Sequence, residues 1–346
     1  MLKRCGLFAF LSAMALAAGQ VQAAVVLPVS AYTKPDQPVV VKFLNEKGDE
    51  GKKAVAALGV SAGKLDWLFT PAASADIASG GTAAFKLYSA DGKEVKVSSV
   101  TPAADGTVDL SAACPDLKNG GTWFLVWKDA TPLVIETLYN PGRGKAELDR
   151  IKSQIEMLPD PQKSQRLAEY APVVTHVELA EVAVITTDKG VIRAKFAYDV
   201  APHTVDNFIS LSRQGFYDGS TFHRIISGFM IQGGDAYTDG KAGTGGPGNE
   251  IMHEFSDKKH ERGTLSMARA SSPDSAGSQF FIMHARTASL DNSYSAFGDV
   301  VAGMDIVDAI AKTPTSDENG TVSGAKPKIV SVKIEPGTAE VYGLKK

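Results

Sequence analysis

The most informative stretch of this sequence is residues 216–235, FYDGSTFHRIISGFMIQGGD. Short apolar runs alternate here with glycines and polar residues, which predicts strands joined by tight turns. Because alternate side chains of a strand share one face, we expect Arg224 to share a face with Phe222, and Gln232 with Met230. The predicted surface offers a fixed cation and an amide beside Phe and Met side chains.

This set of groups limits the chemistry of the segment. The guanidinium of Arg224 stays protonated at any relevant pH, so it cannot act as a general base. It can donate hydrogen bonds to an oxygen or to the lone pair of a nitrogen. Without further context an arginine of this kind is most often part of a surface ion pair. In this setting it is typical of a surface that binds and polarises a substrate rather than hydrolysing it.

Three more stretches follow in the same half of the chain. They are GTLSMARA at 263–270, GSQFFI at 277–282, and Leu290-Asp291 followed by Tyr294 and by AFG at 296–298. Together with residues 216–235 they resemble, in order and spacing, the motifs of the cyclophilin family of peptidyl-prolyl cis-trans isomerases. The resemblance runs from Val182 to roughly Pro336, about half of the chain, and does not touch the first 140 residues.

The resemblance implies a mainly β fold: an eight-stranded closed β-barrel with two capping helices. It also implies rotation about X-Pro peptide bonds with no cofactor, no metal and no covalent intermediate. By resemblance Arg224 is the catalytic residue, since it would donate to the lone pair that twisting leaves on the proline nitrogen. The implied substrate-binding residues are Phe229, Met230, Gln232, Ala268, Arg269, Ala270, Gln279, Phe281, Leu290 and Tyr294.

Three positions depart from the best-known family pattern. Ser289 stands where eukaryotic cytosolic members carry a tryptophan, so the apolar area and the N–H donor of an indole are missing and we expect weak cyclosporin binding. Tyr294 stands in place of a site histidine, and Arg269 in place of the common asparagine. None of these changes removes Arg224 or the apolar pocket, so isomerase activity remains expected.

Local patterns in this half of the chain agree with a barrel. Residues 182–186 and 191–196 predict a hairpin around a turn at 187–190. Helices are predicted over 202–211 and 304–311 from the spacing of their apolar residues. Two helices among many strands fit a closed barrel with helical plugs better than a parallel βαβ sheet.

The first part of the chain predicts a different domain. Strands are expected at residues 39–44, 85–88, 95–97, 122–127 and 133–138. Asp91-Gly92 and residues 128–132 are the expected hairpin turns. This spacing is typical of a small β-sandwich, so we assign residues 24–140 to a sandwich-like domain whose role and ligand the sequence does not identify.

A helical segment is predicted between the two domains. Leu148, Ile151, Ile155 and Leu158 recur at helical spacing with charged residues between them. Such an apolar stripe is most often a docking face against a neighbouring domain, with a partner protein as the alternative. Residues 141–175 are therefore predicted to form a helical linker.

The N-terminus has the pattern of a secretory signal. Two basic residues precede an apolar run over 7–18 that is too short to span a bilayer, and VQA at 21–23 offers a cleavage site before Ala24. We expect a signal peptide at 1–23 and a secreted, periplasmic protein with no membrane span after cleavage; the alternative is an N-terminal membrane anchor. Only Cys114 remains after cleavage, which excludes an intrachain disulfide.

Composition narrows the possible partners. Apolar residues make up 44% and charged residues 22% of the chain, and the net charge is -3, which predicts neither nucleic acid nor an anionic membrane as a partner. The six histidines have no metal-ligand spacing, so no metal is expected.

The sequence therefore predicts an isomerase that acts on proline-containing polypeptide chains and assists the folding of exported proteins. The isomerase domain is assigned to residues 176–336, followed by a tail at 337–346. The alternative is a proline-segment-binding module or chaperone in which turnover is incidental. The additional N-terminal domain favours this alternative, because catalysis on short peptides does not require it.

Overall fold

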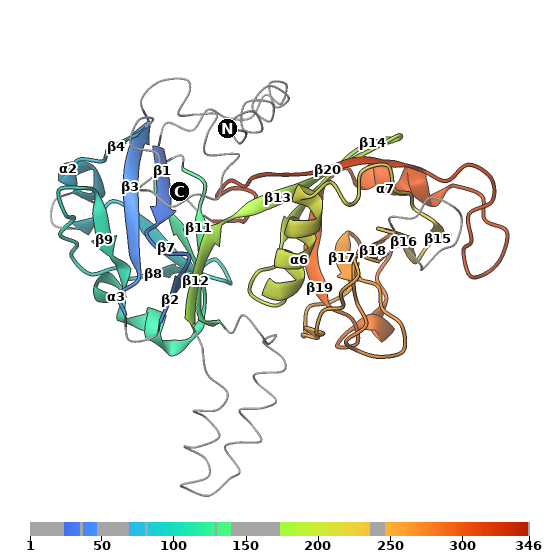
Figure 1. Ribbon diagram of the computed structural model, residues 1–346, viewed down its shortest axis with the longest axis horizontal. Coiled ribbons are helices and arrows are strands. Elements are labelled where there is room, and N and C mark those ends of the chain that lie inside the picture. The colour runs from blue at the N-terminus through green and yellow to red at the C-terminus, as the bar shows by residue number, and fades with distance from the viewer. Residues whose placement is uncertain are drawn as a thin grey trace, which may run out of the picture.

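The computed structural model describes residues 24–34, 37–46, 69–79, 82–128, 130–139, 174–235 and 246–344 (Figure 1). The expected signal peptide at 1–23 and the helix expected around 148–158 lie outside these ranges. Within them, no helix is both long and apolar enough to cross a membrane. The described chain is mainly β, as predicted, with two larger sheets in its first part and an eight-stranded sheet in its second.

The first part contains a four-stranded and a six-stranded sheet. The smaller one consists of β1 (Ala24–Pro28), β3 (Val40–Glu46), β4 (Phe69–Pro71) and β9 (Thr107–Asp109). The larger one has the order β2 (Tyr32–Thr33), β12 (Val174–Leu179), β11 (Leu133–Tyr139), β10 (Gly121–Val126), β7 (Lys86–Ser89), β8 (Glu94–Val95). The predicted β7–β8 and β10–β11 hairpins are confirmed. Short elements complete this part: α2 (Ser74–Ile77), β5 (Ala78–Ser79), β6 (Thr82–Ala83), α3 (Leu110–Ala113) and η2 (Pro115–Asn119).

The six-stranded sheet is buried on both faces. Leu125 of β10 and Ile135 of β11 pack in one hydrophobic cluster with Phe43 of β3, so this face meets the smaller sheet. Their neighbours Phe124 and Val134 belong instead to the cluster that fills the second part of the chain. Because side chains alternate along a strand, the second face of this sheet must be the one that packs against the second part.

The second part is built on an antiparallel eight-stranded sheet. Its order is β15 (Arg224–Ile226), β16 (Met230–Gly233), β18 (Phe280–Met283), β17 (Thr264–Met267), β19 (Ala296–Ala302), β14 (Gly190–Phe196), β13 (Glu181–Thr187), β20 (Ile329–Pro336). In the paired strands the sheet is open, with β15 and β20 at its edges. Helices α6 (Pro202–Arg213) and α7 (Met304–Ala311) pack on it and confirm the two predicted helices. Phe208 of α6 meets Phe280 edge-on at 5.3 Å in the core.

The two parts meet where β12 runs into β13 (Figure 1). Only Ala180 separates these two strands. Because β12 pairs with β11, residues 174–179 belong to the six-stranded sheet of the first part, whereas the helical linker was predicted to extend to residue 175. No turn signal marks this change, because the chain passes directly from one sheet into the next. The C-terminal residues also return to this junction, where the ring of Tyr342 lies 5.3 Å from that of Phe124 and 6.3 Å from that of Tyr198.

Candidate active site

A cavity of about 190 Å³ opens on the second part of the chain. Its lining consists of residues singled out in the sequence: Arg224, Phe229, Met230, Gln232, Ala268, Arg269, Phe281, Leu290 and Tyr294. Gln279 adjoins this set, since its Oε1 accepts a hydrogen bond of 2.9 Å from Nε2 of Gln232. The structure therefore brings together ten of the eleven residues from segments that are up to about 70 positions apart in the chain.

Ala270 is the residue that does not line the cavity. Its backbone N–H donates to Oγ of Ser275 at 2.9 Å, and the N–H of Ala268 donates to the carbonyl of Gln279 at 2.9 Å. Both donors are thus used within the protein. A bound peptide would have to find other backbone partners on this edge.

Strand pairing places the polar and apolar groups of the cavity beside one another. Arg224 of β15 lies opposite Gln232 of β16, and Gln232 lies opposite Phe281 of β18. Met230 and Gln232 line the cavity while Ile231 between them is in the core, as strand alternation predicts.

The expected pairing of Arg224 with Phe222 on one face is wrong. Phe222 is fully buried in the core, whereas Arg224 lines the cavity. The strand begins only at Arg224, so the two-residue repeat does not extend back to Phe222. Phe229 likewise precedes β16, which explains why it lines the cavity together with its neighbour Met230.

A chain of hydrogen bonds orients the polar wall. Nε of Arg224 donates to the carbonyl of Asn319 at 2.8 Å, and one terminal nitrogen donates to Oε1 of Gln232 at 3.2 Å. Gln232 donates to Gln279, whose Nε2 donates to Oδ2 of the buried Asp235 at 3.3 Å. A carboxylate can only accept, so Asp235 determines which way both amides point.

The apolar wall is a small cluster separate from the main core. Met230 and Phe281 are almost completely buried in it, and Phe229, Leu290 and Tyr294 pack against them while remaining partly exposed. The rings of Phe281 and Tyr294 meet edge-on at 5.7 Å. This wall offers an apolar surface against which a small ring can pack.

Two residues that support the cavity, His260 and Asp291, were given no role in the sequence analysis. His260 is fully buried, stacks on Phe281 at 6.1 Å, and has ring nitrogens 3.3 Å from Oδ1 of Asp291 and 3.0 Å from Oγ of Ser266. Burial lowers the pKa of His260, and the hydrogen bond from the backbone N–H of His260 lowers that of Asp291 to about 2. His260 and Asp291 are 31 positions apart in the chain, so no short sequence motif links them.

A second cation lies at the rim of the cavity. The guanidinium of Arg269 sits over the ring of Tyr294 at 4.7 Å and donates through Nε to the carbonyl of Ser293 at 3.2 Å. One of its terminal nitrogens donates to the carbonyl of Ala270 at 2.9 Å. These contacts hold the tyrosine ring and the rim loop together.

The composition of this lining determines what the cavity can do. No histidine, cysteine or carboxylate is among the described residues that line it. It combines fixed hydrogen-bond donors with an apolar wall, which suits binding and polarisation of a neutral group.

Comparisons with known proteins identify the family to which the second part of the chain is similar. The model of the cyclophilin type peptidyl-prolyl cis-trans isomerase/CLD family matches residues 182–334. A peptidyl-prolyl cis-trans isomerase of Synechococcus elongatus is 45% identical over 152 residues, which is 44% of this chain and 94% of the relative. One from Arabidopsis thaliana is 39% identical over 152 residues, covering 43% of this chain and 94% of the relative.

A solved structure is also similar. It is a cyclophilin type peptidyl-prolyl cis-trans isomerase of Cryptosporidium parvum, crystallised in the presence of the dipeptide Ala-Pro. Its sequence is 31% identical and its TM-score is 0.41, and the match covers 45% of this chain and 99% of that one. Taken with the near-complete coverage of the bacterial and plant relatives, the family match leads to one conclusion. This chain belongs to the cyclophilin-type peptidyl-prolyl cis-trans isomerase family, through residues 182–334.

Proposed function

We propose that the cavity binds the proline of an X-Pro segment and that Arg224 promotes rotation about the imide bond. One observation supports this most strongly: the guanidinium of Arg224 is held by Asn319 and Gln232 beside the apolar wall. A protease-coupled assay on a tetrapeptide with one X-Pro bond tests the activity. The full chain without its signal peptide should accelerate exchange, and a rate equal to the uncatalysed one would contradict the proposal.

The chemistry follows from amide resonance. Resonance holds the C–N bond planar with a barrier of about 18–20 kcal/mol, and uncatalysed exchange at X-Pro takes about 10–100 s. Twisting the bond localises a lone pair on the proline nitrogen. A donor aimed at that nitrogen binds the twisted state more tightly than either planar isomer and so lowers the barrier. Two N–H groups of Arg224 are engaged by Asn319 and Gln232, and its remaining N–H groups, which make no hydrogen bond to the described residues, could serve this role.

The other residues have separate roles in this proposal. The proline ring rests against Phe229, Met230, Phe281 and Leu290, where its burial supplies binding energy. Gln232 and Gln279, oriented by Asp235, are the candidates for hydrogen bonds to the substrate backbone. Ala268 and Ala270 use their own N–H groups internally, so the backbone N–H of Arg269, which has no partner among the described residues, is the candidate donor on that edge.

The wider role we infer is assistance to the folding of exported proteins, which rests on the signal-like N-terminus. The competing role is a proline-binding chaperone with incidental turnover, and the domain packed against the isomerase fold favours it. An Arg224→Ala chain separates the two in refolding of a client limited by proline isomerisation. Lost acceleration supports catalysis, whereas retained acceleration supports binding alone.

Two features of the architecture belong to the same proposal. In this proposal the eight-stranded sheet, although open in its paired strands, closes into a barrel. Two contacts support the closure: a β-bridge joins Thr221 to Lys328, and the N–H of Phe222 donates a hydrogen bond of 2.9 Å to the carbonyl of Pro327. The first part of the chain, residues 24–140 with β12, forms a sandwich-like domain around the cluster that Phe43 shares with Ile135.

A further inference from the structure

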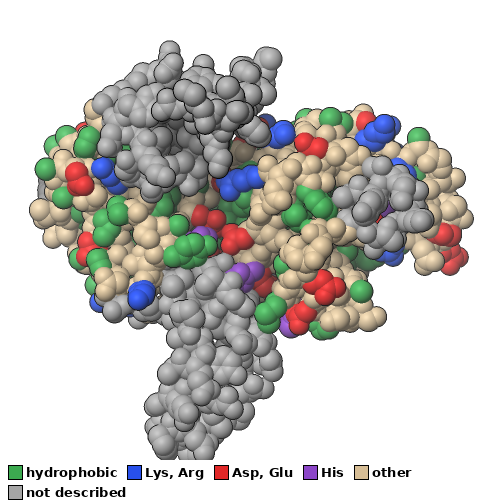
Figure 2. Space-filling model, viewed as in Figure 1, with side chains coloured by type: hydrophobic (Ala, Val, Ile, Leu, Met, Phe, Trp, Pro, Cys, Tyr) green, Lys and Arg blue, Asp and Glu red, His purple; other side chains and the backbone are tan. Residues whose placement is uncertain are grey.

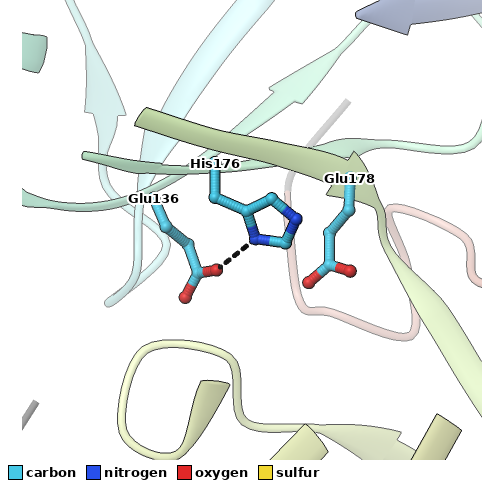
Figure 3. Close-up of side chains that lie close together, drawn as sticks. All are labelled: Glu136, His176 and Glu178. Carbon is cyan, nitrogen blue, oxygen red and sulfur yellow. Dashed lines mark hydrogen bonds and ion pairs between the residues drawn. The ribbon is translucent and has the colours of Figure 1, made fainter. Parts of the chain in front are cut away.

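A second group of reactive side chains lies at the junction of the two domains. Glu136 of β11 and His176 of β12 are cross-strand partners, and Glu178 follows two positions after the histidine. The three therefore project from one face of the six-stranded sheet (Figure 3). It is the face that Val134 shares with the core of the second domain, so the group lies between the two domains.

These side chains are close together and removed from water. Glu136 and His176 are 4% and 6% exposed, and Nδ1 of His176 lies 3.2 Å from Oε2 of Glu136. Glu178 keeps part of its surface exposed, but its Oε1 is buried and has no hydrogen-bond partner among the described residues. One nitrogen or oxygen from each residue lies within 4.8 Å of those of the other two.

Carboxylates outnumber imidazoles among the described residues of this group. Two carboxylates face a single imidazole, and Asp206 of α6 adds further negative potential at both glutamates. Figure 2 shows acidic and histidine side chains gathered at this junction. Arg213 acts electrostatically on Glu178, but its hydrogen bond of 2.6 Å goes to Glu181. A buried carboxylate oxygen without a partner is costly, and a bound cation would satisfy it.

The donor set indicates which cation fits. One imidazole nitrogen with carboxylate oxygens suits a divalent transition metal, whereas Ca²⁺ and Mg²⁺ prefer oxygen ligands alone. Two ligands bound about 2.0–2.1 Å from a tetrahedral Zn²⁺ lie about 3.3 Å apart. The 3.2 Å between His176 and Glu136 is close to that value, and a small rotation would bring in Glu178.

The site also has a supporting aromatic ring and an approach from solvent. Tyr32 stacks on the imidazole of His176 at 4.7 Å with its plane inclined by 12°, which restrains the ring. Tyr32 is itself 50% exposed, so the group lies just beneath the surface.

We propose that Glu136, His176 and Glu178 bind a divalent transition-metal ion, with Zn²⁺ as the best match, between the two domains. The ion would tie β11 to β12 at the point where the chain crosses from one domain to the other. None of its ligands lines the isomerase cavity, so its role is to stabilise the junction.

Metal binding to the full chain without its signal peptide tests this proposal directly. After treatment with EDTA, titration with ZnCl₂ against a chromophoric chelator should reveal one ion per chain and a rise in melting temperature. Glu178→Gln and His176→Gln should each weaken Zn²⁺ binding by at least about tenfold, since even the loss of a supporting residue around a metal ligand costs about 10–100-fold. Tetrapeptide turnover verifies that each variant is folded.

A matched control is available elsewhere on the molecule. His253 also contacts a carboxylate, Oδ1 of Asp274 at 2.7 Å, but at an exposed position, so His253→Gln should leave Zn²⁺ affinity unchanged. X-ray absorption of the Zn²⁺-loaded wild-type chain should show nitrogen and oxygen ligands that include an imidazole, with no sulfur. Absence of stoichiometric binding, equal affinity in Glu178→Gln, or sulfur ligation from Cys114 would overturn the proposal.

Discussion

Arg224 and Gln232 are joined across the β15–β16 pair by a hydrogen bond of 3.2 Å from the guanidinium to Oε1. The same glutamine donates to Gln279, so its amide cannot rotate without losing one of the two bonds. The guanidinium of Arg224 is thus held by the side-chain amide of Gln232 and by the backbone carbonyl of Asn319. A donor held in place before the substrate arrives needs no reorganisation during the reaction.

Removal of this donor should abolish most of the turnover. Arg224→Ala is expected to lower kcat/KM by about 10²–10³, the usual cost of losing one preorganised donor, while binding of a proline peptide persists. The protease-coupled tetrapeptide assay and peptide titration measure the two quantities. Arg193→Ala is the control, because Arg193 pairs with Glu335 outside the cavity. Full activity of Arg224→Ala would contradict the mechanism.

The positioning role of Gln232 predicts a smaller effect. Gln232→Met keeps the length of the side chain but removes its hydrogen bond to Arg224, and we expect kcat/KM to fall about fivefold, equivalent to about 1 kcal/mol. Gln214→Met, which removes an exposed hydrogen bond from the side-chain amide of Gln214 to Oγ of Ser210 on α6, should have no effect on turnover. An unchanged kcat/KM in Gln232→Met would contradict both the positioning role of Gln232 and its proposed hydrogen bond to the substrate backbone.

Cyclosporin affinity should depend on position 289. Ser289 is exposed on η3, next to the cavity residue Leu290, so a larger side chain can be accommodated there without displacing the core. Ser289→Trp adds an apolar ring and an N–H donor, and we expect it to strengthen cyclosporin binding at least about tenfold in a fluorescence titration. Ser98→Trp, at an exposed position in the first domain, is the control. Tight binding by the wild-type chain would contradict the expectation.

The pH dependence of turnover should be flat. Arg224 stays protonated, and the aromatic residue at position 294 is a tyrosine rather than a histidine, so kcat/KM should vary less than about twofold between about pH 6.5 and 9. A bell-shaped profile over this interval would indicate an acid or a base that the cavity lining does not contain.

Stability, in contrast, should fall in acid because of His260. Burial lowers its pKa below the ordinary 6.5, so between the lowered value and 6.5 the unfolded chain binds a proton that the folded chain does not. The contribution of His260 to the free energy of unfolding is therefore present above pH 6.5 and is lost as the pH falls through this interval. Urea unfolding of wild type and His260→Gln across the interval should give a steeper slope for the wild type; equal slopes would exclude this contribution.

Tyr342 should couple the two domains. Its ring packs against Phe124 and Tyr198, and its hydroxyl donates to the carbonyl of Glu181. Tyr342→Ala should cost about 3 kcal/mol and separate calorimetric unfolding into two transitions, whereas Tyr342→Phe keeps the ring and should cost about 1 kcal/mol. Equal melting curves for wild type and Tyr342→Ala would contradict this coupling.

The isomerase half was predictable because its signals are local. The hairpin at 182–196 and the two helices follow from turn residues and apolar spacing, whereas the cavity residues were predicted from the resemblance of continuous motifs to the cyclophilin family. Strand alternation does not extend to Phe222 or to Phe229, because each of them lies before the strand that follows it. Side-chain propensities do not predict the residue at which a strand begins, because the strand's start depends on its pairing with the neighbouring strand.

Local sequence patterns could not predict the contacts between distant segments of the chain. His260 against Asp291, Asp235 against Gln279, and Glu136 against His176 join residues 31, 44 and 40 positions apart. Their proximity depends on strand register and on the packing of one domain against another, neither of which leaves a fixed spacing in the chain. Turn residues and side-chain periodicity depend on a few neighbouring residues, so the sequence by itself determined them. The contacts that support the cavity and the charged group at the domain junction form only when the tertiary structure brings separate strands together.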